Sequence, residues 1–229
     1  MLRKLNLATK ILLSGVLITL GFAAVLLWLY PRVRDSAFSA KSEKTRHVVE
    51  TAVGVVEFFG KQAEQGKLSL AQAQEGARNA LKTMRYGQND YFWINDLTPR
   101  MVMHPTNPAL DGKDLSDQRD PDGKPMFVEM ARVARTQGQG TVPYKWAKPG
   151  FSQPVPKISF VKLYRPWGWV IGSGIYLDDV EAELSRVKWV MLGGTMLITL
   201  LGLVGSWGTA RSISAPIRRL VDELYQGAD

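Results

Sequence analysis

The chain carries two uncharged apolar runs, at residues 11–30 and 189–210, on either side of a long polar middle. Each run reaches the roughly 20 apolar residues that cross a hydrocarbon core about 30 Å thick. Within a bilayer the backbone has to satisfy its own hydrogen bonds, so each run is predicted to be a membrane-spanning helix. A chain held in a membrane at both ends of one middle domain is suited to pass information between two compartments.

Basic residues flank both runs on the sides that face away from the middle. They are Arg3, Lys4 and Lys10 before the first run and Arg211, Arg218 and Arg219 after the second. The positive-inside rule therefore places both termini in the cytoplasm and residues 31–188 outside. A cleaved signal peptide is the alternative for the first run, but its apolar core is usually about 7–15 residues long. Residues 25–30 continue past the only small-residue cluster, so we expect an uncleaved anchor.

The polar middle begins with helical patterns. Residues 31–65 lack internal proline and carry apolar residues at helical spacing, which predicts one long helix continuing from the first membrane span. Ser69 and Gln72 form a capping-box pattern, which predicts a second helix over residues 70–85. Asp178 is predicted to open a last helix that leads into the second span.

Short β-prone runs between turn residues follow the two helices. They predict strands at 91–94, 101–104, 140–147, 157–165 and 169–177, with a short helix at 125–137. The predicted fold class is α+β, with a long N-terminal helix and a PAS-like five-stranded antiparallel sheet. No strand alternates regularly with a helix, so a doubly wound parallel sheet is not expected.

Charge and motifs exclude two function classes. The net charge is +8, which by itself is typical of nucleic-acid binding, but six of the basic residues are the membrane flanks. The middle mixes both signs without a concentrated patch, so no nucleic-acid partner is expected. The chain has no cysteine and lacks the common hydrolase, zinc-protease and phosphate-loop motifs. We therefore expect neither an enzyme nor a cofactor.

Several segments of the middle carry a family resemblance when they are taken in order. They are YFWIND at 91–96, HP at 104–105, GKDL at 112–115, DPDGKP at 120–125, PKISFV at 156–161 and WGWVIGSGIY at 167–176. Together they resemble the single Cache (type 2) extracytoplasmic sensor domain of bacterial chemoreceptors and sensor kinases, over roughly residues 35–185. Residues 209–220 resemble the start of a HAMP linker.

The resemblance implies a dimeric receptor that binds a small organic ligand outside and signals inside. Such domains often bind short carboxylates such as acetate, propionate, pyruvate or lactate. The resemblance also implies the bacterial inner membrane, crossed twice, with a periplasmic sensor domain. The expected division is a cytoplasmic N-terminus (1–10), a first membrane helix (11–30), a periplasmic sensor domain (31–188), a second membrane helix (189–210) and the start of a HAMP linker (211–229).

A buried carboxylate needs a cation and neutral hydrogen-bond donors. Lys157 is the expected cation by the family pattern; alternatively it is a solvated lysine that protects a sheet edge. His104 ends a predicted strand and is either a ligand donor with near-neutral titration, which would make binding pH-dependent, or a structural histidine. His47, the other histidine, is expected at a dimer or sheet interface.

Aromatic residues supply the remaining ligand contacts. Tyr91 and Trp93 share one face of their strand because side chains alternate, and each combines apolar area with a polar donor. We predict that this face lines the ligand site and that Phe92 and Ile94 pack on the long helix, although both pairs are also ordinary core candidates. Tyr144 and Ser173 are weaker candidates for the ligand site.

Five aspartates at positions 111, 114, 117, 120 and 122 resemble a calcium loop at first sight. Placing Gly123 at the sixth position of such a loop puts Gln118 at the first position, which is a poor ligand, and Lys124 and Pro125 follow at once. Turn formation and capping explain these aspartates better, so no metal is expected.

The predicted function is a transmembrane chemoreceptor-type sensor for a short organic acid, acting as a homodimer. The chain ends at Asp229, before any output domain, so we expect either a fragment or a natural short receptor. A cytoplasmic kinase or adaptor is reached only through such an output domain. The alternative is a membrane-anchored binding or scaffold protein without its own signalling output.

Overall fold

The computed structural model describes residues 7–87 and 89–226. The chain forms two compact units, of which the first combines Met1–Asp35 with Glu183–Asp229 and the second is Ser36–Ala182. Two long helices run through both: α1 (Leu7–Glu64) begins in the first unit, and α4 (Leu177–Gln226) ends in it.

The first unit consists of the two predicted membrane segments. Two helices of the described chain are long and apolar enough to cross a membrane, with mean hydropathy 2.1 over an 18-residue stretch of α1 and 1.8 over an 18-residue stretch of α4. The helices approach closely at Gly15, where an added Cβ would lie 2.8 Å from Ser206 Oγ. Contacts of this kind, between small residues, allow two helices to pack tightly in lipid.

The second unit is built on an antiparallel sheet with the strand order β4-β3-β7-β6-β5. The strands are β3 (Trp93–Asp96), β4 (Met101–Met103), β5 (Gln139–Ala147), β6 (Pro154–Tyr164) and β7 (Trp169–Tyr176). A small hairpin of β1 (Arg85–Tyr86) and β2 (Asp90–Tyr91) precedes them. The predicted α+β class and five-stranded sheet are therefore confirmed.

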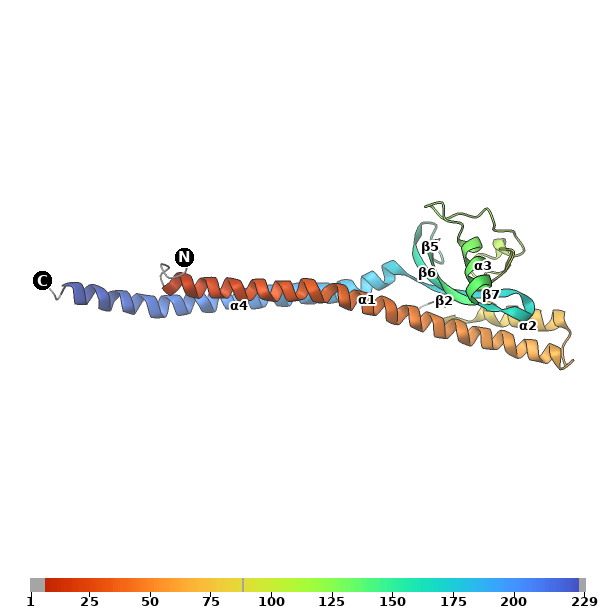
Figure 1. Cartoon of the computed structure of the whole chain (residues 1–229), viewed down its shortest axis with the longest axis horizontal. Coiled ribbons are helices and arrows are strands. Elements are labelled where there is room, and N and C mark those ends of the chain that lie inside the picture. Colours follow the sequence, from red (N-terminus) through yellow and green to blue (C-terminus); the bar gives the residue numbers. More distant parts are fainter. Residues whose placement is uncertain (1–6, 88, 227–229) are drawn as a thin grey trace. The chain divides into compact units, whose positions relative to one another are not determined.

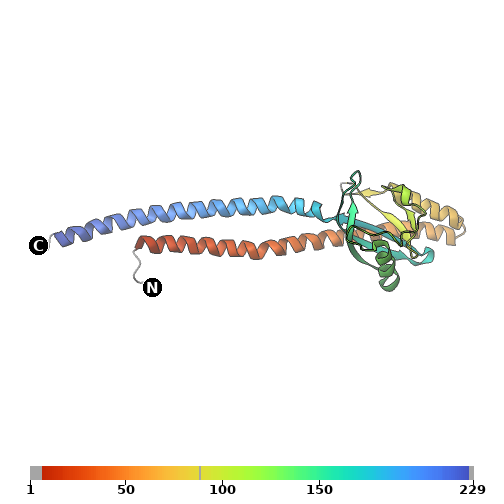
Figure 2. The ribbon, with the colours of Figure 1, turned by 90° about the horizontal axis from the view of Figure 1, so that it is seen from above.

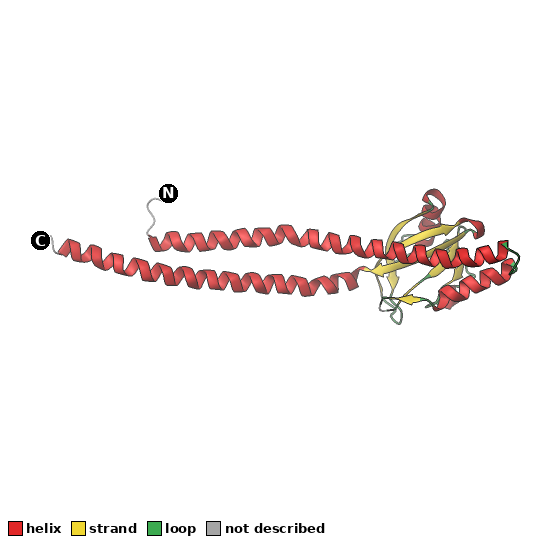
Figure 3. Ribbon diagram, turned by 90° about the horizontal axis from the view of Figure 1, so that it is seen from below, coloured by secondary structure: helices red, strands yellow, loops and turns green. Residues whose placement is uncertain are grey.

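Two apolar cores cover the two faces of this sheet. On one face, α1 and α2 (Leu70–Thr83) lie side by side, with Val49, Val56 and Leu81 packed on strand residues (Figure 1, Figure 3). On the other face lies α3 (Met126–Gln137), shown in green in Figure 2, whose Met130 and Val133 contact the strands. Each helix supplies one apolar stripe, as expected for a helix packed on a sheet.

Most predicted element boundaries agree with the structure. The capping box at α2 is present, with Ser69 Oγ accepting from the Gln72 backbone and the Gln72 side chain accepting from the Ser69 backbone. The predicted strand 91–94 is interrupted at Phe92, because Tyr91 pairs with Arg85 whereas Trp93 pairs with Gly172. The two-residue strand β1 was not predicted, since so short a strand leaves no periodic pattern.

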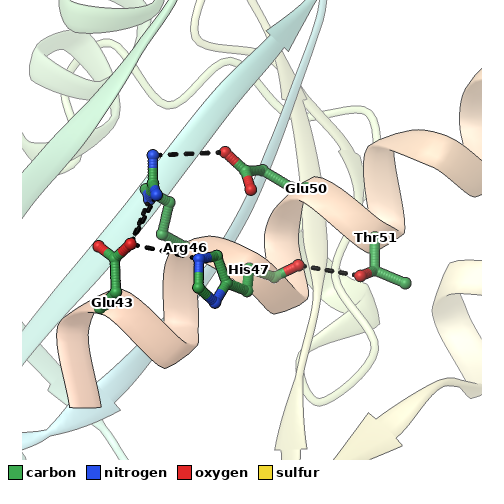
Figure 4. A network of polar contacts seen from close by, with 5 residues as sticks. All are labelled: Glu43, Arg46, His47, Glu50 and Thr51. Atoms are coloured by element: carbon green, nitrogen blue, oxygen red, sulfur yellow. Dashed lines mark hydrogen bonds and ion pairs between the residues drawn. The ribbon is translucent and has the colours of Figure 1, made fainter. Parts of the chain in front are cut away.

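His47 lies on the exposed side of α1, opposite the residues that face the sheet. Its side chain is 62% exposed, and Nε2 lies 3.2 Å from Glu43 Oε1 in a surface network with Arg46 and Glu50 (Figure 4). The expectation of a sheet interface for His47 is therefore wrong, because the sheet-facing positions of this helical segment are Val49, Ala52 and Val56.

Candidate ligand-binding site

Lys157 lies in the centre of the sheet domain. It is on β6, between Tyr144 of β5 and Tyr176 of β7 in the strand register. Because β6 has a neighbouring strand on each side, Lys157 does not protect a sheet edge. Its side chain points toward the α3 face and is only 2% exposed. The alternative of a solvated edge lysine is therefore excluded.

The partners of the Lys157 ammonium are aromatic. Nζ donates to the Tyr91 hydroxyl at 3.1 Å and to the Tyr176 hydroxyl at 3.3 Å. It also lies 4.5 Å from the ring centroids of both tyrosines and 5.5 Å from that of Trp93. Among the ion pairs of the described residues, none includes Lys157.

This arrangement leaves the buried Lys157 ammonium without a carboxylate in direct contact among the described residues, although its charge also acts on the half-buried Asp90. Phenol oxygens and aromatic faces attract a cation, but they replace only part of its hydration. Burial opposes ionisation of Tyr91, yet the charge of Lys157 brings the pKa of Tyr91 below its usual value. A buried charge is normally paired with an opposite one. The cluster of Lys157, Tyr91 and Tyr176 is therefore electrostatically suited to an anionic group.

His104 lies beside this cluster at the end of β4. Its ring centroid is 5.2 Å from that of Tyr91 and 5.9 Å from that of Trp146. The backbone N–H of Asn107 donates to Nδ1 at 3.0 Å, so the neutral ring carries its proton on Nε2. His104 thus offers one N–H donor.

The structure corrects the expected titration of His104. Burial, and then the charge of Lys157, lower the pKa of His104 to about 3. The ring is therefore neutral throughout the physiological range, because both effects oppose a second positive charge. Near-neutral titration, which was expected from an ordinary histidine, is not supported.

The lowered pKa of His104 predicts an acid-sensitive fold. The unfolded chain binds a proton at His104 below about pH 6.5, whereas the folded chain does so only near pH 3. As far as His104 is concerned, the free energy of unfolding is highest above pH 6.5 and decreases as the pH falls from 6.5 toward 3. The slope of this decrease approaches about 1.4 kcal/mol per pH unit. We expect His104→Gln to reduce this slope in thermal unfolding measured from pH 7 to 4. His47→Gln is the matched control, and an unchanged slope in H104Q would contradict the assignment.

Two further hydroxyls, those of Tyr144 and Ser159, lie on the same face. Tyr144 donates to or accepts from Ser159 Oγ at 3.0 Å, and both side chains are buried. The Tyr176 hydroxyl donates to the carbonyl of Ala147 at 2.9 Å. Burial raises the pKa of Tyr144 and of Tyr176, with the nearby Tyr91 adding to both, so these hydroxyls keep their protons.

The structure brings together five of the six candidate ligand residues, which are Tyr91, Trp93, His104, Tyr144 and Lys157. Trp93 contributes its ring rather than a free donor, because its indole N–H donates to Asn95 Oδ1 at 3.2 Å. Ser173 is not part of the cluster. Its hydroxyl lies 2.6 Å from the Tyr86 hydroxyl and donates to the Tyr91 carbonyl at 2.6 Å. Its neighbours Gly172 and Gly174 occupy the α3 face instead.

Sequence reasoning missed Tyr176, Ser159 and Trp146, although β7 carries a usable signal. An added Cβ at Gly172 would lie 2.3 Å from the Trp93 ring, and one at Gly174 would lie 2.1 Å from Ser159 Oγ. Glycine at alternate positions therefore marks the strand face that adjoins the cluster, and alternation places Tyr176 on that face.

The aspartates of the 111–122 loop organise backbone turns. The Asp120 carboxylate accepts from the backbone N–H groups of Asp122, Lys124 and Lys145. Asp114 accepts from the Ser116 backbone, and Asp111 accepts from the His104 backbone at 2.7 Å. This is the turn-forming role that the sequence favoured for these residues.

Comparisons with known proteins agree with this geometry. The chain is 43% identical over 224 residues to methyl-accepting chemotaxis protein McpP of Pseudomonas putida, covering 97% of this chain but 41% of the relative. The chain thus spans less than half the length of that relative.

Two solved structures match the sheet domain. The first, described as the periplasmic sensor domain of a chemotaxis protein, is 54% identical with a TM-score of 0.60, covering 61% of this chain and 96% of its own. The second is described in terms of carboxylic acid recognition by a Cache chemosensory domain. It is 51% identical with a TM-score of 0.60, and the match covers 62% of this chain and 97% of its own. The model of the family described as Single Cache domain 2 matches residues 38–189. The chain therefore belongs to the Single Cache domain 2 family, as the ordered segments of its sequence predicted.

Proposed function

We propose that this chain is the sensor part of a transmembrane chemoreceptor and that its sheet domain binds a short monocarboxylate such as acetate, propionate, pyruvate or lactate. The observation that carries the proposal is the buried Lys157 ammonium, whose hydrogen-bond partners are two tyrosine hydroxyls rather than a carboxylate. The 51% identical Cache structure, described in terms of carboxylic acid recognition, supports the same ligand class.

The cluster provides donors for both oxygens of one carboxylate. Lys157 supplies the charge, and the Tyr91 hydroxyl and the Nε2–H of His104 supply neutral donors beside it. The rings of Trp93, Tyr144 and Trp146 surround these donors and are largely buried. In this proposal the aromatic rings contact a short apolar tail and limit its length, and Ser173 makes no ligand contact.

A pair of ligands that differ mainly in charge tests the proposal. We expect propionate to bind the full chain in detergent micelles in isothermal titration calorimetry, and propionamide to bind at least about tenfold more weakly. The amide has nearly the same shape but cannot compensate the Lys157 charge, and a lost charge-assisted interaction costs roughly 1.5–3 kcal/mol or more. Equal binding of acid and amide, or binding of neither, would contradict a carboxylate site at Lys157.

We also propose the membrane arrangement and the signalling route. Residues 1–10 and 211–229 are cytoplasmic, residues 11–30 and 189–210 cross the bacterial inner membrane, and residues 31–188 form the periplasmic domain. The basic flanks of the two apolar runs support this orientation. Residues 211–229 begin a HAMP linker that leads to an output domain, through which a kinase or adaptor is reached.

In this proposal the signal passes from the ligand site into α4. Tyr176 is the last residue of β7, and α4 begins at the next residue, Leu177. A ligand that changes the position of Tyr176 therefore acts on the start of α4, to the extent that it binds the two states differently. We propose that the receptor works as a homodimer, in which the exposed side of α1 around His47 faces the second copy.

A further inference from the structure

A groove separate from the Lys157 cluster lies between α2 and β4. Its volume is about 570 Å³, within the range of small-molecule sites. The groove is lined on one side by Arg78 and Lys82 of α2 and on the other by Arg100, the strand β4, Asp111 and Gly112. Arg78, Lys82 and Arg100 are exposed side chains, so the groove is open to solvent and basic on both sides.

Two of these cations repel one another in the absence of an anion. Arg78 and Lys82 are four residues apart on α2, so they lie on the same side of the helix, where like charges destabilise it. Among the described residues, no direct ion pair includes Arg78, Lys82 or Arg100, although the charge of Arg100 acts on Asp114, its partner in an isolated β-bridge. An anion between α2 and Arg100 would relieve this repulsion.

On the wall of the groove opposite α2, hydrogen bonds hold Arg100 in place. Arg100 Nη1 donates to the Gly112 carbonyl at 3.2 Å, and the Gly112 N–H donates to the Met101 carbonyl at 2.7 Å. These bonds hold the 111–112 turn beside β4 and position the Arg100 guanidinium at the groove. A guanidinium keeps several N–H donors free when one is used, so Arg100 is still able to bind an anion.

The one acid of the groove also connects it to the Lys157 cluster. Asp111 Oδ1 accepts from the His104 backbone N–H at 2.7 Å, and His104 directly follows β4, which lines the groove. A ligand that moves Asp111 therefore acts on the strand end that carries the His104 ring.

We propose that the groove between α2 and β4 is a second binding site, for a small multivalent anion such as a polycarboxylate or phosphate. Cations on two walls favour a ligand with more than one anionic group, whereas a monocarboxylate satisfies only one wall. The bond between Asp111 and His104 gives this site a route to modulate the carboxylate site, and that part of the inference rests on the proposed function.

The test uses the full chain in detergent micelles with citrate and inorganic phosphate as probes. We expect titration calorimetry to show one citrate or phosphate bound per chain. The double variant that combines Arg78→Gln with Lys82→Gln should weaken this binding at least about tenfold. Lys67→Gln removes an exposed charge just before α2 and should leave binding unchanged. Circular dichroism confirms that the double variant stays folded, since glutamine retains helix propensity. Failure of both probes to bind, or unchanged binding in the double variant, would overturn the proposal.

Lys157→Met separates the groove from the carboxylate site. We expect citrate or phosphate binding to persist in Lys157→Met, because Lys157 does not line the groove. Loss of that binding would mean that the anions occupy the Lys157 cluster, and the groove proposal would be wrong. The proposed carboxylate function fails by a different result, which is the absence of propionate binding to the unmodified chain.

Discussion

Lys157→Met is expected to abolish propionate binding and, at the same time, to raise the stability of the ligand-free domain. Binding is lost because methionine carries neither the charge nor the donor hydrogens of lysine. Stability rises because the lysine charge is buried without a carboxylate in direct contact, and a thioether of similar volume needs no hydration. Replacing buried charges by apolar residues stabilises some proteins by about 1–4 kcal/mol. We expect the lower half of this range, because the Tyr91 hydroxyl loses its lysine partner.

Calorimetry and thermal unfolding on the same sample measure both effects. Lys162→Met is the matched control, because Lys162 lies on the same strand but its side chain points to the opposite face. This control should bind propionate normally. Retained binding in Lys157→Met would remove the basis of the carboxylate proposal. Lost binding together with a large loss of stability would show instead that Lys157 mainly supports the fold.

The fold was predictable because its local patterns agree with one another. Helical periodicity, one capping box and five β-prone runs separated by turns indicated the elements, and the ordered family segments indicated how they assemble. Alternation correctly separated Tyr91 and Trp93 from Phe92 and Ile94, which fall in the two different cores. These are statements about periodicity, which the sequence carries directly.

The site was predictable only in part, because it depends on pairing and burial. Ser173 was assigned to the ligand site as a polar residue on a suitable strand, but the face of β7 is decided by its register with β3 and β6. Gly172, opposite Trp93, lies on the cluster face, so Ser173 lies on the other. Likewise, the titration of His104 is set by its burial near Lys157, which no local pattern reveals.

A contact that sequence reasoning did not find connects the site to α4. Lys148 follows β5 directly. Its Nζ lies 2.7 Å from Asp178 Oδ2 and 2.6 Å from Asp179 Oδ1, and both aspartates are in the first turn of α4. Burial opposes the charge of Lys148, but these two carboxylates raise its pKa above the usual value. The preceding residue, Ala147, accepts the hydrogen bond of Tyr176, which itself accepts from Lys157. A continuous chain of contacts thus joins the Lys157 ammonium to the start of α4.

Lys148→Gln is therefore expected to uncouple ligand binding from the proposed signal. The full chain, joined to the output module of an established chemoreceptor, should lose most of its propionate-dependent change in kinase activity, by roughly tenfold or more. Propionate affinity should change less than about threefold, since Lys148 does not contact Lys157 and meets the cluster only at the ring of Tyr176, whose centroid is 5.5 Å from Nζ. The physical reason is that glutamine cannot hold two carboxylates, so the end of β5 no longer moves with α4. Lys145→Gln, which breaks the exposed ion pair with Asp122, is the matched control three residues before Lys148, on β5, and should respond normally. A full response in Lys148→Gln would show that coupling passes through the backbone of β7 alone.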